Sequence, residues 1–161
     1  MLLDKKTDSE KVAKAYESLL AHNYDDVIAG LADNEFFENE DKLQASAALG
    51  QAYFAKKNFE KSTENYEAAS SLSDTDKQKS YYQNLIGNCL REAKKYDDAV
   101  KAYEASVKLN ARNELAWINL INILVIRGND SGAEDAYTRA INANPGNITI
   151  KAAEKTLQAD R

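Results

Sequence analysis

The sequence predicts an all-α fold in which antiparallel helix pairs stack on one another. Two observations support this prediction. When the chain is shifted by 34 residues, residues 87–111 superpose on residues 121–145, and small, aromatic and turn residues fall on their own kind. A period of about 34 residues fits one helix–turn–helix unit. The composition, with 43% hydrophobic and 29% charged residues and one proline in 161, favours helices over strands or disorder.

The two copies resemble the tetratricopeptide repeat (TPR) pattern. The markers of the second copy are Trp117-x2-Leu120, Ala133-x3-Tyr137-x2-Ala140 and Pro145; those of the first are Gly87, Tyr96 and Ala99-x3-Tyr103. The resemblance implies a right-handed α-solenoid of about four repeats with a C-terminal capping helix. It also implies a protein that binds other proteins.

Residues 8–41 are expected to form a degenerate first repeat within a single domain that spans residues 1–161. Thr7 and Glu10 fit a capping box, in which a hydroxyl and a carboxylate satisfy backbone amides at the start of a helix. This first helix is expected to end at His22, because a cation suits the helix dipole there. A second helix is expected to open at Tyr24.

Five acidic residues surround Phe36 and Phe37 in residues 33–41, between the first and second repeats. One interpretation is a solvated turn in which one of the two phenylalanines fills the core. The other is an acidic hook for a basic partner. A calcium loop is disfavoured because the alternating oxygen ligands and the central glycine are missing.

The second repeat, residues 43–79, lies 37 residues before the third, so it contains three extra residues. The markers that share this spacing are Gly50, Tyr53, Phe59, Tyr66 and Ala69. The polar run 70–76 is the predicted place of the insertion. There it either lengthens a turn or adds most of a helical turn.

The third repeat is assigned to residues 80–113, the fourth to 114–147 and the capping helix to 148–161. Ser131 and Glu134 fit a second capping box. The fourth repeat should end at Pro145, which cannot continue a helix. The capping helix is expected to turn Ile150, Ala153 and Leu157 toward the array, because repeat arrays need covered ends.

Small residues are expected where two helices of a repeat cross, and tyrosines are expected to fill the next layer, against the following repeat. The small residues are Gly50, Gly87, Ala99 and Ala133, and the tyrosines are Tyr66, Tyr103 and Tyr137. Ile121 departs from this pattern, so it should either push its two helices apart or turn outward. Trp117 is expected in the core between the third and fourth repeats.

Charge and residue types exclude several functions. The net charge is −5, and residues 1–42 hold 11 acidic against 5 basic residues, so nucleic-acid binding is not expected. No apolar run is long enough to insert into a membrane. Cys89 is the single cysteine and is expected to pack as a small hydrophobe. We expect no catalytic residues, no metal site and no cofactor. A cytoplasmic location is the simplest expectation, or a periplasmic or exported one if a leader has been removed.

The TPR resemblance implies that partners bind in a concave groove lined by the first helix of each repeat. The predicted partner-binding residues are Gln51, Phe54, Tyr81, Asn84, Asn88, Arg91, Asn119 and Asn122. One amide per repeat, from Gln51, Asn88 and Asn122, would form a row suited to the backbone of an extended peptide. Alternatively, asparagine is simply common at this position of the repeat.

Some family members clamp a partner's C-terminal carboxylate with cations. Here the corresponding positions hold Ala47, Gln51, Leu85, Leu115 and Asn119, so that clamp is absent. The leading hypothesis is a non-catalytic scaffold or adaptor that binds a peptide or helix of a protein partner in the groove. The alternative is a structural protein that self-associates through the repeat ends or the convex face, and an enzyme ranks third.

Overall fold

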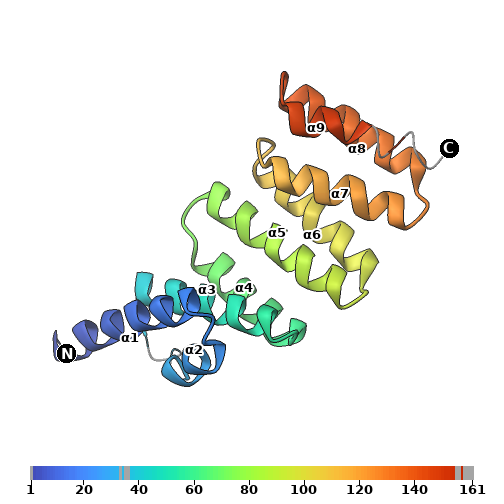
Figure 1. Cartoon of the computed structure of the whole chain (residues 1–161). Coiled ribbons are helices and arrows are strands. Elements are labelled where there is room, and N and C mark those ends of the chain that lie inside the picture. Colours follow the sequence, from blue (N-terminus) through green and yellow to red (C-terminus); the bar gives the residue numbers. More distant parts are fainter. Residues whose placement is uncertain (1, 33, 35–36, 155–156, 158–161) are drawn as a thin grey trace. The chain divides into compact units, whose positions relative to one another are not determined.

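The structure is a computed structural model, which describes residues 2–32, 34, 37–154 and 157 (Figure 1). All regular secondary structure in these residues is helical, which confirms the all-α prediction. The chain forms two compact units, Met1–Asp74 and Thr75–Arg161. None of the described helices is both long and apolar enough to cross a membrane.

Each unit is built from paired helices. The first unit contains α1 (Leu2–Leu20), α2 (Tyr24–Gly30), α3 (Asn39–Ala55) and α4 (Phe59–Leu72). The second unit contains α5 (Asp76–Glu92), α6 (Tyr96–Leu109), α7 (Glu114–Ile126), α8 (Asp130–Ala143) and α9 (Ile148–Ala152). The pairs are α1 with α2, α3 with α4, α5 with α6 and α7 with α8 (Figure 1).

The turn inside each pair has the same backbone geometry. One residue per turn has a positive φ: His22 (60°), Lys57 (61°), Lys94 (60°) and Gly128 (68°). We call these the left-handed turn residues. Each lies two positions after the last residue of the first helix of its pair, so these residues align the four pairs whatever their side chains are. His22 therefore lies in the turn after α1 rather than at the end of the helix, and its Nδ1 lies 2.9 Å from the Tyr24 hydroxyl.

Two predicted capping boxes are wrong. Helix α1 already begins at Leu2, because residues 2–6 contain no glycine or proline to prevent helix formation, so Thr7 lies inside it. Helix α8 begins at Asp130 and is capped by Asn129, whose Oδ1 accepts from the Gly132 amide at 3.1 Å. Ser131 therefore lies within the first turn of α8 and does not cap it.

Helix α3 also begins earlier than the predicted Leu43, at Asn39. Glu40 and Asp41 thus lie in its first turn, where carboxylates are favoured by the helix dipole. The Ser9 hydroxyl donates to Asp41 Oδ1 at 2.9 Å. Phe37 is 3% exposed and belongs to the core of the first unit, so the prediction of a core phenylalanine is confirmed. Phe36, with Asp33 and Glu35, lies outside the described residues.

The insertion in residues 70–76 lengthens a helix. Helix α5 has 17 residues, whereas α7 has 13, and the added turn is at the N-terminus of α5. Thr75 caps this helix in a capping box, since its hydroxyl accepts from the Gln78 amide and its own amide donates to the Gln78 side chain. The alternative in which the insertion adds helix is therefore confirmed. This cap was not predicted from the sequence, because the run was assigned to a polar turn.

The tyrosines pack onto glycine within their own helix pair. A Cβ atom on Gly87 would lie 2.4 Å from Cε1 of Tyr103, and one on Gly50 would lie 2.6 Å from the Tyr66 ring. These glycines thus provide the room that the rings occupy. The tyrosines were predicted to pack against the following repeat. Tyr66 and Tyr103 pack on a glycine of their own pair, and Tyr103 also shares a core with Trp117 of the next pair, as predicted.

The fourth pair has no glycine at this point. Ile121 is 0% exposed, so of the two predicted alternatives the one in which it turns outward is wrong. Trp117 is 3% exposed and its Nε1 donates to the Ala111 carbonyl at 2.9 Å, which confirms it as a core residue. Ile150 and Ala153 of the C-terminal segment are buried in the same core, and Leu157 packs against it, as predicted.

The same ion pair links successive helix pairs in both units. In the first unit Lys56 Nζ lies 2.7 Å from Asp25 Oδ1, and in the second Arg127 pairs with Asp97. Each cation directly precedes a left-handed turn residue, and each carboxylate lies in the first turn of α2 or α6. Exposed pairs of this kind contribute about 0–1 kcal/mol. They recur because the cation suits the helix C-terminus and the acid suits the N-terminus.

Candidate functional site

The candidate site in the second unit is the surface shared by α5 and α7, which are the first helices of their pairs. These helices contact each other, because Asn119 Nδ2 of α7 donates to Asn84 Oδ1 of α5 at 2.9 Å. We call this surface the α5–α7 face. It consists of Tyr81, Asn84, Asn88 and Arg91 from α5, and of Leu115, Ile118, Asn119, Asn122, Val125 and Ile126 from α7.

Two sets of buried polar contacts hold α5, α6 and α7 together beneath this face. At the start of α7, Asn113 Nδ2 donates to the hydroxyls of Ser80 (2.9 Å) and Ser106 (3.2 Å). The Ser106 hydroxyl in turn donates to the Ser80 carbonyl at 2.7 Å. Ser80 and Ser106 are 0% exposed, so these hydrogen bonds satisfy groups that water cannot reach.

The second set is an amide network that includes three of the predicted site residues. Asn119 Nδ2 donates to Asn84 Oδ1 and also to Asn88 Oδ1 at 3.2 Å. The Tyr103 hydroxyl donates to the same Asn88 oxygen at 2.8 Å. Burial raises the pKa of Tyr103 to about 12, so this donor stays protonated at neutral pH. The network thus connects α5, α6 and α7.

This network uses only part of the hydrogen-bonding capacity of the amides. Asn84 is 4% exposed and is held inside the face. Asn88 and Asn119 are half-buried, and neither Asn88 Nδ2 nor Asn119 Oδ1 bonds to another described residue. Asn122 is also half-buried and makes no hydrogen bond with the described part of the chain. Two donors and two acceptors therefore stay available on these three residues.

Helix α7 contributes an apolar stripe to the face. Leu115 is 63% exposed and Ile126 is 59% exposed, while Ile118 and Val125 between them are half-buried. The opposite side of α7 packs in the core through Trp117, Leu120 and Leu124, among others. A helix that is apolar on all sides is normally covered on all sides. Tyr81 of α5, 54% exposed, extends the apolar surface of the face.

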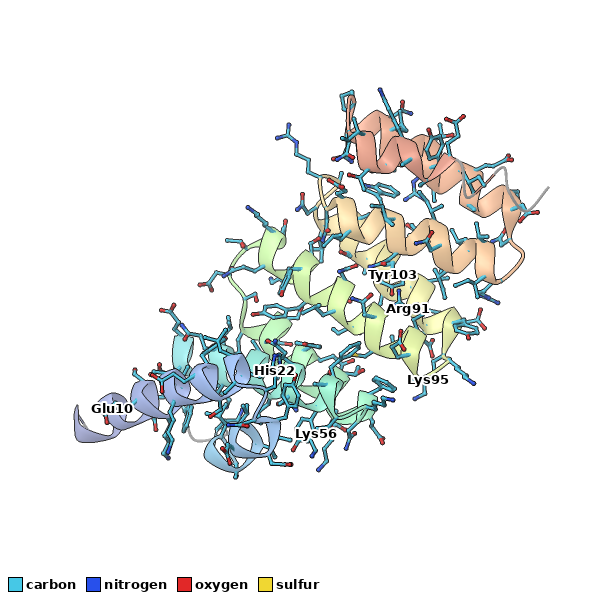
Figure 2. All side chains as sticks on the ribbon, in the orientation of Figure 1. Glu10, His22, Lys56, Arg91, Lys95 and Tyr103 are labelled. Carbon is cyan, nitrogen blue, oxygen red and sulfur yellow. The ribbon has the colours of Figure 1, made fainter. Side chains whose placement is uncertain are left out.

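The cation of the face, Arg91, is already paired on its own helix. Arg91 Nη2 lies 3.0 Å from Glu92 Oε1, and both side chains are partly exposed. Figure 2 shows Arg91 and Lys95 together near the C-terminal end of α5, with Tyr103 further into the unit. The positive charge of the face is thus local and partly neutralised.

Two of the predicted site residues, Gln51 and Phe54, lie on α3 in the first unit. Gln51 is exposed, and Phe54 is half-buried with its ring edge-on to Phe59 at 5.6 Å between centroids. Gln51 precedes its left-handed turn residue by six positions, as Asn88 and Asn122 precede theirs. In α1 the same position is Tyr16, which is 39% exposed. Tyr16 was not among the residues predicted from the sequence, although the same six-residue count would have found it.

Within the described residues, no group of three or more His, Cys, Asp or Glu side chains is arranged to hold a metal ion. Cys89 is 0% exposed and packs as a small core residue, as predicted. The α5–α7 face thus offers hydrogen bonds and apolar contacts.

Comparison with known proteins identifies the repeat. Tetratricopeptide repeat models match residues 43–76 and 84–148, which together make up more than half of the chain. A mouse protein, the protein O-mannosyl-transferase TMTC1, is 36% identical over 75 residues, or 47% of this chain. The chain spans 8% of the length of that relative.

Solved structures with the same fold include other TPR proteins. The MamA protein matches with a TM-score of 0.72 and 19% identity, covering 96% of this chain and 86% of that one. The Sgt2 TPR domain of Aspergillus fumigatus has a TM-score of 0.62 and 20% identity, with 74% and 78% covered. The second TPR domain of human RPAP3, in complex with an HSP70 peptide, has a TM-score of 0.58 and 14% identity, with 70% and 92% covered. At these identities the likeness shows the fold alone.

Proposed function

The chain belongs to the tetratricopeptide repeat family, and on this premise we propose that it is a non-catalytic scaffold that holds a segment of a protein partner on the α5–α7 face. TPR domains generally mediate protein–protein interaction. The observation that carries the proposal is the apolar stripe of α7, with Leu115 63% and Ile126 59% exposed. Exposed apolar surface next to polar groups marks interaction sites.

The face is suited to a partner segment that has one apolar side and one polar side. Apolar side chains of the partner pack on Leu115, Ile118 and Val125, where burial of apolar area supplies most of the binding free energy. The free amide groups of Asn88 and Asn122 bond to polar groups of the partner, including its backbone. The network beneath the face holds the Asn88 amide in place through Tyr103 and Asn119, so little side-chain entropy is lost there on binding.

Charge has a smaller part in this proposal. Arg91 is paired with Glu92, and the positions of the known carboxylate clamp carry no cation. We therefore expect binding to depend weakly on salt, in contrast to an interaction built on surface ion pairs. Gln51 and Phe54 are proposed as contact residues of the corresponding face in the first unit.

The test compares a face variant with a matched control. Leu115→Ser combined with Asn122→Ala removes one apolar contact and one free amide, and neither residue belongs to the amide network. Ile148→Ser on α9, where the side chain is 82% exposed, removes a similar aliphatic group away from the face. Asn88→Ala is unsuitable, because it would leave the buried Tyr103 hydroxyl without its acceptor.

Proteins retained from a lysate of the source organism are identified by mass spectrometry for the wild type and both variants. Loss of a partner by the face variant alone, with unchanged helicity by circular dichroism, is the expected result. Equal retention by all three chains would exclude the α5–α7 face. A mass in solution that rises with concentration and does not need a partner would instead favour self-assembly.

A further inference from the structure

The amide network beneath the α5–α7 face fixes which polar atoms the face offers to a partner. The Tyr103 side chain is 0% exposed, and its hydroxyl donates to Asn88 Oδ1 at 2.8 Å. Turning the Asn88 amide over would leave the hydroxyl proton without an acceptor, which is unfavourable where water does not reach. Asn88 therefore keeps its oxygen in the network and directs its Nδ2 donor away from it.

The same network fixes the amide of Asn119 the other way round. Its Nδ2 carries two protons, and both are used, since this atom donates to Asn84 Oδ1 at 2.9 Å and to Asn88 Oδ1 at 3.2 Å. Only the oxygen of Asn119 is left for a partner. The face thus presents a donor from α5 beside an acceptor from α7, and the two cannot exchange places unless these bonds break.

Both of these atoms lie at the surface. Within the described residues, every buried side-chain nitrogen or oxygen atom has a hydrogen-bond partner. Asn88 Nδ2 and Asn119 Oδ1 bond to no other described residue, so neither atom is buried. Tyr81 and Leu115, which precede them on the same two helices, are 54% and 63% exposed, whereas Asn88 and Asn119 are half-buried. A side chain of a partner reaches such recessed atoms more readily than its backbone does.

A side-chain carboxamide complements this pair of atoms. Its oxygen accepts from Asn88 Nδ2, and its nitrogen donates to Asn119 Oδ1. A carboxylate of the same shape has only acceptors, so one of its oxygens would face Asn119 Oδ1 and lose water without gaining a bond. Arg91 adds little attraction for a carboxylate, because its charge is offset by Glu92, whose Oε1 lies 3.0 Å from Arg91 Nη2.

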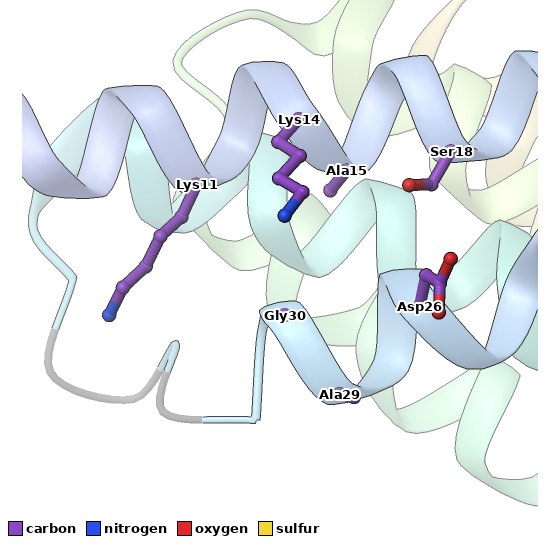
Figure 3. Close-up of a pocket in the computed structure, with 7 residues that line it drawn as sticks. All are labelled: Lys11, Lys14, Ala15, Ser18, Asp26, Ala29 and Gly30. Carbon is purple, nitrogen blue, oxygen red and sulfur yellow. The ribbon is translucent and has the colours of Figure 1, made fainter.

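The pocket between α1 and α2 in the first unit has no such fixed pair. It has a volume of about 530 Å³, and Lys14 on α1 and Asp26 on α2 line it (Figure 3). Both side chains are exposed and bond to no other described residue, so nothing holds their charged groups in one arrangement. Groups that are already held in place lose less side-chain entropy on binding. The amide pair of the α5–α7 face is therefore the better basis for a specific contact.

We propose that the α5–α7 face recognises a glutamine or asparagine side chain of the partner segment, bound between Asn88 Nδ2 and Asn119 Oδ1. This rests on the proposed function, because it names the group that the same face distinguishes. Tyr103 is a positioning residue, since it holds the Asn88 amide without touching the partner. Asn122 makes no hydrogen bond with the described residues, so its amide can turn either way and bonds equally to a carboxamide or a carboxylate.

The probe is a phage-displayed library of random peptides of about 12 residues, long enough when extended to span α7. The library is selected on the immobilised full chain. We expect the retained peptides to combine apolar residues with Gln or Asn, and to show no enrichment of Glu or Asp. One retained peptide is then synthesised with a fluorescein label in three versions, with its carboxamide residue kept, changed to the matching acid or changed to Met.

The affinities of the three versions for the full chain are measured by fluorescence anisotropy. We expect the carboxamide version to bind about tenfold more tightly than the acid or the Met version, because each of these leaves at least one amide group of the face unpaired. Equal affinities of the carboxamide and acid versions would overturn the inference.

Three variants of the chain separate the roles of the amides. Asn119→Ala removes the acceptor, so the carboxamide and acid versions should bind within about twofold of each other. Tyr103→Phe keeps the buried ring but releases the Asn88 amide, so the preference should fall to about threefold, whereas a loss of packing alone would weaken all versions alike. The matched control, Asn122→Ala, removes an amide of the same face outside the network. It should weaken all three versions alike and leave their ratio within about twofold.

The outcomes also separate this inference from the proposed function. Retained peptides that are apolar but carry no Gln or Asn would overturn the inference and leave the proposed function standing. If Leu115→Ser with Asn122→Ala retains the same peptides as the wild type, or if the wild type retains none, both fail. A preference that survives Asn119→Ala, or that is lost in Asn122→Ala, would also overturn the inference. Circular dichroism verifies the fold of each variant, and Tyr103→Phe keeps the test decisive if Asn119→Ala does not fold.

Discussion

The pairs α5–α6 and α7–α8 follow the same 34-residue repeat but fill their crossing points in different ways. In α5–α6, Gly87 leaves room for the ring of Tyr103, which is 0% exposed. In α7–α8 the residue at the crossing is Ile121, which comes from the first helix of the pair, whereas Tyr103 comes from the second helix of its pair. Ile121 is 0% exposed. Tyr137, the counterpart of Tyr103, is half-buried, with its hydroxyl 3.4 Å from Glu154 Oε2.

This difference shows that the side chain that fills a crossing can come from either helix of the pair. Only the arrangement with glycine on the first helix brings a tyrosine hydroxyl to the candidate site. With glycine on α5, the tyrosine hydroxyl reaches Asn88 and becomes part of the amide network. With isoleucine on α7, the tyrosine is displaced toward the C-terminal segment. The polar half of the α5–α7 face therefore depends on the glycine crossing.

The strongest test of this comparison removes each tyrosine. Tyr103→Ala should lower the free energy of unfolding by about 3–5 kcal/mol, as truncation of a fully buried aromatic side chain does. Tyr137→Ala should cost about 1 kcal/mol, because its ring is already partly exposed. Urea unfolding followed by circular dichroism measures both. Similar costs for the two variants would show that the crossings are equivalent after all.

The next test changes the residue that the first helix contributes to each crossing, Gly87 in α5 and Ile121 in α7. Ile121→Ala should cost about 2–5 kcal/mol, because it leaves a cavity in the core. Gly87→Ala should cost about 1–3 kcal/mol for the opposite reason, since the added methyl overlaps the Tyr103 ring. Replacing Tyr103 with Leu in the Gly87→Ala background should recover part of that loss. If Gly87→Ala were neutral or stabilising, close packing of the ring on glycine would not be the reason for its burial.

A smaller effect is expected at the turn inside each of the two pairs. Lys94 adopts φ 60°, where Gly128 of the following pair adopts φ 68°. A side chain in this left-handed region costs about 1–2 kcal/mol, part of which is offset by the favourable position of a cation at a helix C-terminus. We expect Lys94→Gly to stabilise the chain by about 0.5–1 kcal/mol and Gly128→Lys to destabilise it by a similar amount. Thermal midpoints that move the other way would contradict the strain at Lys94.

The last test uses pH. Burial raises the pKa of Tyr103 from its ordinary value of 10.0 to about 12, so the folded chain keeps this proton longer than the unfolded chain. Its contribution to stability is complete below about pH 10 and is lost as the pH rises toward about 12. The wild type should therefore lose stability over this range more steeply than Tyr103→Phe, as measured by urea midpoints. Partial burial and then Glu154 also raise the pKa of Tyr137, and we expect Tyr137→Phe to change the slope less because that side chain is more exposed.

Much of the fold could be predicted from the sequence, because repeat spacing and core residue types are local properties. The recurrence of Ala99 and Ala133 at 34 residues indicated the helix pairs, and the apolar periodicity of the last segment indicated that Ile150 faces the core. Helix starts were less predictable. Asn129, Ser131 and Asp130 can all cap a helix, and the choice among them depends on where the preceding turn places the chain.

The candidate site was predicted in outline only. The amides of Asn84, Asn88 and Asn119 were assigned to one surface, but the sequence cannot show that they bond to one another and to Tyr103.

The sequence by itself determined the all-α class, the repeat period and the residues that form the core, because these follow from the spacing of small and apolar residues along a helix. The tertiary structure decided which side chain fills each crossing and which asparagine oxygens are already occupied. It also decided which apolar side chains and amide groups stay open to a partner. Those properties depend on contacts between helices whose residues are separated by about a full repeat, and they arise only once the pairs have packed.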